Sequence, residues 1–211
     1  MATKIENLLT WIPEKIFFFL ELNISISSMM LPCFFDFSSK TEVLLGQGDG
    51  TYLDAQGGWD TPQSATGLRY QETHSVPALA DFDNDGHLDL AISAVYVGRP
   101  MDFYWGNGDG TFRLDAYRSG LWVTNGWGLA TADVDRDGRQ DLASKEALFL
   151  NTGEAPGHWL EVAVVGDVAA NRMGLGATVR VVAGDRVWLR HVSGGDGQGG
   201  QASPYLHVGL G

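Results

Sequence analysis

Residues 81–89 read DFDNDGHLD, and residues 133–141 repeat the pattern as DVDRDGRQD. Both stretches follow the formula D-x-D-x-D-G-x-x-D, with acidic residues at positions 1, 3, 5 and 9 and glycine at position 6. Ca²⁺ takes six to eight oxygen ligands, and carboxylates at alternate positions of a tight loop converge on one point when a glycine permits the sharp turn. The two stretches therefore predict two calcium-binding loops.

In each loop we expect four side-chain carboxylates and one backbone carbonyl to bind the ion. The first loop supplies the carboxylates of Asp81, Asp83, Asp85 and Asp89 and the carbonyl of His87. The second loop supplies the carboxylates of Asp133, Asp135, Asp137 and Asp141 and the carbonyl of Arg139. The imidazole of His87 is not expected to be a ligand.

An acidic, solvated turn and an EF-hand both fit these loops less well than a calcium-binding hairpin. In a solvated turn, two unit charges about 4 Å apart repel by roughly 4 kcal/mol at a protein surface, so four carboxylates would leave the loop strained or loose without a cation. A helix-loop-helix EF-hand requires a bidentate Glu at position 12. Position 12 is Ile92 in the first loop and Ser144 in the second.

The composition limits the partners and the class of fold. The 211 residues suffice for one or two domains, and 14 Lys and Arg against 26 Asp and Glu give a net charge of -12, which argues against a nucleic-acid partner. The 28 glycines and the abundant aromatic residues fit short strands joined by turns. Cys33 is the single cysteine, so no disulfide can form within the chain.

Residues 1–40 differ from the rest, and we expect an irregular leader that is not part of the native fold. Its apolar run, residues 16–20, is much shorter than the roughly 20 residues of a membrane span. Glu6 and Glu14 occupy what would be the basic region of a signal peptide. No membrane span is therefore predicted, and a cleaved or anchoring segment is the alternative.

Repetition begins near residue 41. The stretch VLLGQGDGTY at 43–52 matches FYWGNGDGTF at 103–112, and a shortened copy, LFLNTG, lies at 148–153. Each full copy is an apolar strand, a glycine-rich turn and a returning strand, and repeats of 50 to 60 residues with several short strands predict a β-propeller or a related array. Asp49 and Asp109 lie in these turns and are not expected to be ligands.

Apolar runs flank both Asp loops, so each loop is predicted to connect the two strands of a β-hairpin. Phe82 and Val134, the second residues of the loops, are expected to pack inward beneath the metal. After Gly157 the alternating stretches 158–165, 177–182, 186–192 and 205–208 predict a separate small β domain over residues 157–211.

These motifs resemble known families. The Asp loops with their following G-x-G-D-G-T hairpins look like FG-GAP/VCBS repeats, and the tail motifs HWL (158–160), NRMGLGA (171–177), VSGG (192–195) and SPYLHVGLG (203–211) resemble an ASPIC/UnbV domain. The resemblance implies an all-β chain: partial integrin-type β-propeller repeats at 41–156 followed by a small β-sandwich-like domain at 157–211, which is expected to be truncated. It also implies calcium in the hairpin loops and an extracellular or cell-surface location.

The functional hypothesis is a calcium-dependent, non-catalytic recognition or adhesion module with a protein or glycan ligand. No H-E-x-x-H or G-x-S-x-G motif is present, and the five histidines are scattered. Trp59, Trp122 and Trp127 are candidates for ligand contact, although packing between blades explains them better. The alternative is an accessory domain of a larger secreted hydrolase or lyase.

Overall fold

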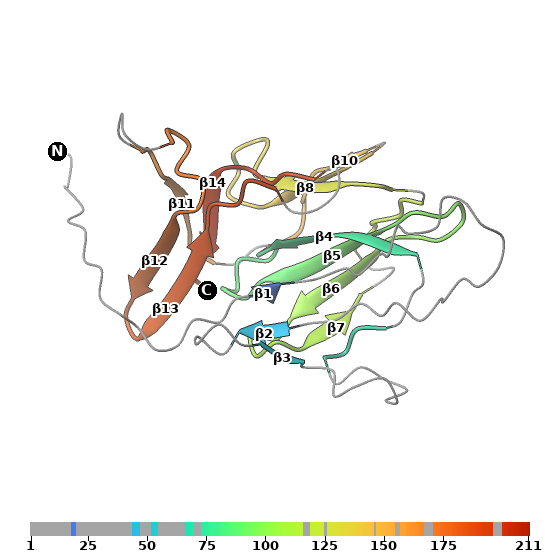
Figure 1. Cartoon of the computed structure of the whole chain (residues 1–211), viewed down its shortest axis with the longest axis horizontal. Helices are drawn as coiled ribbons and strands as arrows, with labels where there is room; N and C mark the ends of the chain where they lie inside the picture. The colour runs from blue at the N-terminus through green and yellow to red at the C-terminus, as the bar shows by residue number, and fades with distance from the viewer. Residues whose placement is uncertain are drawn as a thin grey trace.

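The computed structural model of the chain is built from β-strands (Figure 1). It describes residues 66–69, 73–115, 119–124, 126–145, 147–154, 157–166, 171–195 and 200–211, together with the backbone of three short strands nearer the N-terminus. Every helix or strand element among these residues is a strand, which confirms the predicted all-β fold. The described residues contain no helix of the length and apolarity that a membrane span requires.

The three strands nearest the N-terminus form one antiparallel sheet. β2 (Leu44–Gly46) pairs with β3 (Tyr52–Asp54), as the first glycine-turn hairpin predicted. β1 (Phe18–Phe19) pairs with β2 and is the only part of the predicted 1–40 leader that the structure describes. Trp59, Asp49 and Cys33 lie outside the described residues.

Two further antiparallel sheets each contain one Asp loop. β4 (His74–Ala80), β5 (Asp89–Ala94), β6 (Asp102–Gly106) and β7 (Phe112–Leu114) form a four-stranded sheet in chain order. β8 (Leu129–Ala132), β9 (Asp141–Ser144) and β10 (Leu148–Phe149) form a three-stranded sheet, also in chain order. Residues 81–88 connect β4 with β5 and residues 133–140 connect β8 with β9, so both predicted hairpins are confirmed.

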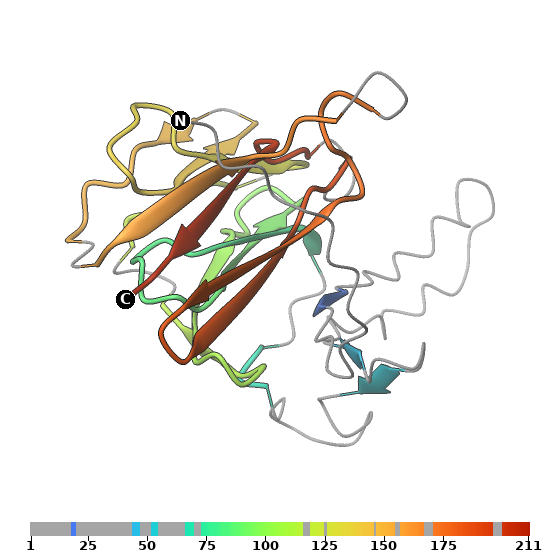
Figure 2. The ribbon, with the colours of Figure 1, turned by 90° about the vertical axis from the view of Figure 1, so that its left-hand side faces the viewer.

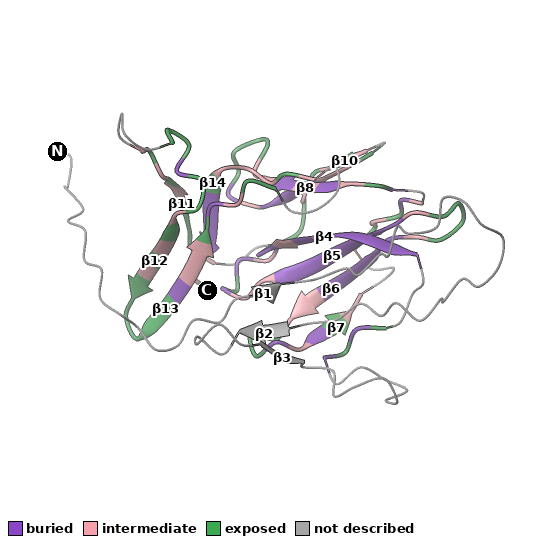
Figure 3. Cartoon of the chain, viewed as in Figure 1, coloured by how far each residue is buried: buried purple, intermediate pink, exposed green. Residues whose placement is uncertain are grey.

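The main core lies between these two sheets, which form successive layers in Figure 1. Small residues on one face of β4, Ala78 and Ala80, allow the second sheet to approach closely, and Leu129 and Leu142 meet them from β8 and β9. Phe82 joins the same cluster and packs edge-on against the ring of Phe103 at 5.3 Å. Figure 3 shows that β5 is buried along its whole length, whereas β4 alternates with intermediate residues near its end and the last two residues of β6 are intermediate.

The prediction that Val134 packs inward is wrong. Phe82, its counterpart 52 residues earlier, is 8% exposed, whereas Val134 is 52% exposed. The two residues differ in what lies over them. The β8–β10 sheet covers Phe82, whereas Val134 lies on a face of the β8–β10 sheet that is partly exposed. This face lines a groove of about 300 Å³ with Ala132, Ala143 and Leu148, and residues 201–203 line the same groove.

The C-terminal part contains two two-stranded antiparallel sheets. β11 (Trp159–Ala163) pairs with β14 (Tyr205–Gly209), and β12 (Thr178–Ala183) pairs with β13 (Arg186–His191). The four strands predicted for this region are thus confirmed. Figure 2 shows the long β12–β13 hairpin crossing the end of the β4–β7 sheet. There Trp188 Nε1 donates a hydrogen bond to the carbonyl of Gly86 (3.1 Å), in the loop between β4 and β5.

Candidate metal centre

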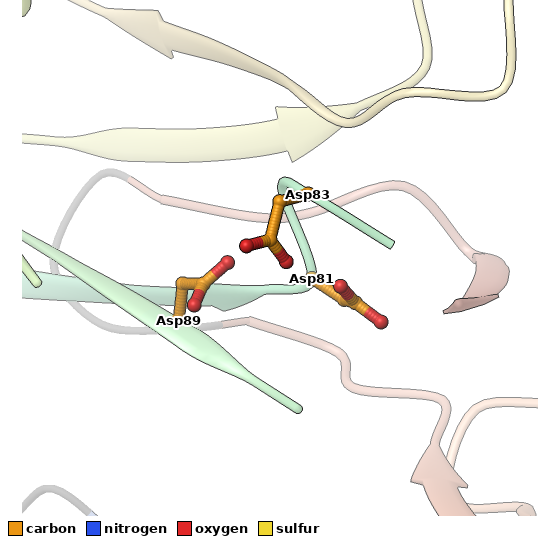
Figure 4. A group of neighbouring side chains, drawn as sticks. All are labelled: Asp81, Asp83 and Asp89. Carbon is orange, nitrogen blue, oxygen red and sulfur yellow. The ribbon is translucent and has the colours of Figure 1, made fainter. Parts of the chain in front are cut away.

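The first carboxylate cluster lies in the loop between β4 and β5 (Figure 4). Ala80 pairs with Asp89, so the antiparallel register brings the two ends of the loop together. Asp81, Asp83 and Asp89 each place one carboxylate oxygen within 4.8 Å of the others. Three carboxylate oxygens at this spacing can hold a metal ion.

Two residues with positive φ turn this loop: Asn84 at 61° and Gly86 at 96°. Hydrogen bonds from backbone amides to aspartate side chains then fix its course. The amide of Gly86 donates to Asp81 Oδ2 (3.0 Å), and the amide of His87 donates to Asp85 Oδ1 (2.7 Å). Such side-chain-to-backbone bonds are the reason why aspartate recurs in tight turns.

The loop between β8 and β9 repeats this geometry. Asp133, Asp135 and Asp141 also bring one oxygen each within 4.8 Å of the others. Arg136 (62°) and Gly138 (87°) provide positive φ at positions 4 and 6, as in the first loop. The two clusters differ in exposure: Asp81 is buried, whereas Asp133 is half-buried and Asp135 is exposed.

The structure places the remaining predicted ligands outside the two clusters. The carboxylate of Asp85 accepts a hydrogen bond from the amide of His87. The carboxylate of Asp137 accepts a hydrogen bond from the amide of Arg139 (2.9 Å) and also forms an ion pair with the guanidinium group of Arg139. The imidazole of His87 packs against Gly108 in the turn between β6 and β7. Coordination by Asp85, by Asp137 and by the carbonyls of His87 and Arg139 remains a prediction.

The aspartate at position 9 of each loop also accepts hydrogen bonds from backbone amides, a structural role that the acidic motif did not predict. Asp89 Oδ2 accepts the amide of Phe82 (2.9 Å), and Oδ1 accepts the amide of Gly106 (2.8 Å) at the end of β6. This carboxylate therefore ties its own loop to the next hairpin of the sheet. The matching bonds in the second loop run to Asp141 from the amides of Val134 (2.8 Å) and Asn151 (2.8 Å).

Burial controls the protonation of the first cluster. Burial raises the pKa of Asp89 to about 8, and burial together with repulsion from Asp85 raises the pKa of Asp81 to about 6. The same two causes raise the pKa of Asp83. Removal from water disfavours a carboxylate, and a neighbouring positive charge restores its ionised form.

The residues of the first loop fit a hard divalent cation. Asp81 is 1% exposed, and its Oδ1 has no hydrogen-bond partner among the described residues, whereas its Oδ2 accepts two backbone amides. An unpartnered buried carboxylate oxygen is costly unless a cation meets it. Because every side-chain donor of the cluster is a carboxylate oxygen, the donor set suits Mg²⁺ or Ca²⁺ better than softer metals.

A second buried polar cluster was not predicted. Asp102 Oδ2 accepts hydrogen bonds from His74 Nε2 (3.0 Å), Arg69 Nε (2.7 Å) and Tyr104 Oη (3.1 Å). Burial alone would raise the pKa of Asp102, but the hydrogen bonds from His74 and Arg69 outweigh it and lower the pKa. The side chains of His74 and Asp102 are almost wholly covered, so this cluster braces the sheet from inside.

Comparison with protein families supports the interpretation of both halves. Residues 81–144 match the FG-GAP-like repeat, a range that contains both Asp loops, and residues 167–211 match the family named ASPIC and UnbV. No curated protein is similar enough to match the chain. The resemblance seen in the sequence motifs is thus confirmed: residues 81–144 belong to the FG-GAP-like repeats and residues 167–211 to the ASPIC and UnbV family.

Proposed function

We propose that this chain is a calcium-binding, non-catalytic recognition or adhesion module of an extracellular or cell-surface protein. The observation that carries the proposal is the pair of three-carboxylate clusters, one of which contains a buried oxygen, Asp81 Oδ1, that has no hydrogen-bond partner in the part of the chain that the structure describes. FG-GAP-like repeats commonly bind Ca²⁺ and are typically extracellular, which agrees with both parts of the proposal.

Calcium suits these loops better than magnesium for two reasons. Ca²⁺ accepts six to eight oxygens in irregular geometry, whereas Mg²⁺ demands a near-ideal octahedron and retains several waters. A loop that offers carboxylates at alternate positions and further oxygens from its backbone satisfies the first requirement. The formal charge of -12 also makes cation binding favourable, and two Ca²⁺ ions would neutralise four of these charges.

Exposed aromatic side chains support a recognition role. Trp122 and Trp127 are 59% and 50% exposed, so a part of each residue is accessible to a ligand. Hydrogen bonds from Gly126 to Ala94 (2.8 Å) and from Met101 to Val123 (2.9 Å) hold this segment beside the connection between β5 and β6. Exposed aromatic residues on loops of a rigid scaffold are frequent contact points for ligands.

A non-catalytic role agrees with the covered position of the His74–Asp102 pair. Their side chains are 1% and 0% exposed, so a substrate has no access to this pair of titratable groups. The aspartates of the loops are poor general acids when they hold a divalent cation, because the cation lowers their pKa values.

Thermal unfolding of the whole chain tests the calcium proposal. At a free Ca²⁺ concentration ten times the dissociation constant, one site adds about 1.4 kcal/mol of stability, so the midpoint should rise with Ca²⁺ relative to EGTA and rise less with Mg²⁺. The double variant Asp83→Ala, Asp135→Ala should lose this response. An equal response of the variant and the wild type would contradict the ligand assignment.

A further inference from the structure

The C-terminal domain covers the first Asp loop. The amide of Gly209, at the end of β14, donates to Asp81 Oδ2 (3.1 Å), and the amide of Gly211 donates to the carbonyl of Asn84 (3.0 Å). The space between the two elements is fully used, since a Cβ on Gly209 would overlap Asp81 Oδ2 and lie 2.6 Å from Asn84 Cα. Backbone from the tail thus contacts a carboxylate of the first cluster directly.

Strand β13 also contacts this loop. Arg186 Nη2 donates to the carbonyl of Asp85 (2.9 Å), and Trp188 Nε1 donates to the carbonyl of Gly86 (3.1 Å). The guanidinium group of Arg186 also lies over the ring of Trp188, 4.9 Å from its centroid. These bonds fix the turn whose Gly86 amide supports Asp81.

Asn84 connects the first Asp loop with the second Asp loop and with the C-terminal tail. Its side chain is 2% exposed; Oδ1 accepts a hydrogen bond from His207 Nε2 (2.6 Å), and Nδ2 donates to the carbonyl of Gly138 (2.9 Å) in the second loop. Its counterpart at position 4 of the second loop, Arg136, has the same backbone φ but is exposed. The two loops therefore share positive φ at positions 4 and 6, but within the described part of the chain only in the first loop does the side chain at position 4 form a hydrogen bond with the tail.

The second loop depends less on the tail for its carboxylates. Asp133, the counterpart of Asp81, accepts the amides of Asp137 (3.1 Å) and Gly138 (2.8 Å), both inside its own loop. The tail reaches this loop through the indole of Trp159, which packs over Gly138 and stacks on the ring of His207. The indole lies over the backbone of the turn, and among the described residues no hydrogen bond joins the tail to Asp133, although the charge of Asp133 acts on His207.

We infer that the C-terminal domain is a structural part of the first metal site, with Asn84, His207 and Gly209 as positioning residues. The inference rests on the proposed calcium binding. Docking of β13 and β14 orders the first loop before an ion arrives, so the first site binds Ca²⁺ more tightly than the second, because preorganised ligands lose less freedom on binding. By linkage, Ca²⁺ in the first site strengthens the docking of the tail by the same factor.

Calcium titration calorimetry of the complete chain tests the difference between the sites. Asn84→Gly removes the side-chain bonds and tolerates the positive φ, and Arg136→Gly is the matched control at the same φ. We expect the wild type to bind two ions in a tighter and a weaker class. Asn84→Gly should weaken the tighter class by about 10-fold to 100-fold, the range found when groups that orient metal ligands are removed, and Arg136→Gly should leave it unchanged.

Hydrogen exchange of residues 205–211 tests the reciprocal effect and does not require the Asn84 variant to fold. Ca²⁺ should slow exchange in the wild type and in Asp135→Ala, but not in Asp83→Ala. Equal calcium affinity in Asn84→Gly and the wild type, or a calcium effect on 205–211 that survives Asp83→Ala, would overturn the inference while leaving calcium binding intact. Absence of any calcium binding to the wild type would overturn the proposed function and the inference together.

Discussion

Gly209 and Asp81 are hydrogen-bonded across 128 residues of sequence, with the amide of Gly209 3.1 Å from Asp81 Oδ2. This bond joins the last strand of the chain to the first residue of the first Asp loop. It also explains why position 209 is glycine, since a side chain there would meet Asp81 and Asn84. The two family segments of the chain are therefore connected through a candidate metal ligand.

Gly209→Ala should destabilise the protein because its Cβ has no room. We expect a loss of about 1–3 kcal/mol in the free energy of unfolding, as for other substitutions that overfill a packed site, measured by urea denaturation in EGTA. Gly194→Ala is the control, since the nearest atom to its Cβ would be Leu175 Cδ1 at 4.0 Å. The control should change the free energy by less than about 0.5 kcal/mol, and equal effects of the two substitutions would contradict the close approach.

Phe82 and Val134 occupy the same loop position and should respond differently to truncation. Phe82→Ala removes a ring from the core between the two sheets, at a cost of about 3–5 kcal/mol. Val134→Ala removes a side chain that is 52% exposed and should cost less than about 0.5 kcal/mol. Urea unfolding of both variants gives the comparison; a large loss in Val134→Ala would mean that its face is covered in solution.

The contrast between Phe82 and Val134 marks what the sequence could predict. The spacing of the aspartates, the hairpins that flank them and most strands are local patterns, and the structure confirms these hairpins and strands because each depends on neighbouring residues. Burial of Val134 depends on which sheet lies over it. No repeat pattern contains that information.

Long-range polar contacts were also missed. Asn84 looks like an ordinary turn residue in the sequence, yet it meets His207 and Gly138, which lie far along the chain. The acidic motif similarly indicated one task for Asp89, although both its oxygens accept backbone amides. A signal for the second task was present: Gly106, which donates one of these amides, lies in the hairpin repeat that follows the first loop.

Substitutions of Asp89 and Asp83 should distinguish the structural contribution of a first-loop carboxylate to stability from its contribution to metal binding. Asp89→Asn leaves one acceptor oxygen for two amide donors, so we expect a loss of about 1–3 kcal/mol in EGTA, where no metal contributes. Asp83→Asn keeps an oxygen for the amide of Asp85 and should change stability in EGTA by less than about 0.5 kcal/mol.

The same pair gives a second comparison in Ca²⁺. Both substitutions remove a charge from the cluster and should weaken the calcium-induced rise in the thermal midpoint. The diagnostic result is therefore the EGTA measurement, in which the two variants should differ. If Asp83→Asn were as destabilising there as Asp89→Asn, the separate structural task of position 9 would be contradicted.

His207 should make the metal-free protein sensitive to acid. Burial, opposed by the charge of Asp133 and reinforced by Arg190, lowers the pKa of His207 to about 4, against 6.5 as the ordinary value. Between these values the unfolded chain binds the extra proton and the folded protein does not, so this contribution to stability is present above about pH 6.5 and is lost as the pH falls toward 4. One proton gives a slope of at most about 1.4 kcal/mol per pH unit.

His207→Gln isolates this effect, because the glutamine amide can still donate to Asn84 and does not titrate. The free energy of unfolding of the wild type, measured relative to this variant, should fall on acidification from pH 6.5 to pH 4. His191→Gln is the control at an exposed histidine, which contacts Thr178 Oγ1, and it should follow the wild type. Parallel curves for the wild type and His207→Gln would show that His207 accepts its proton in the folded state as readily as in the unfolded chain.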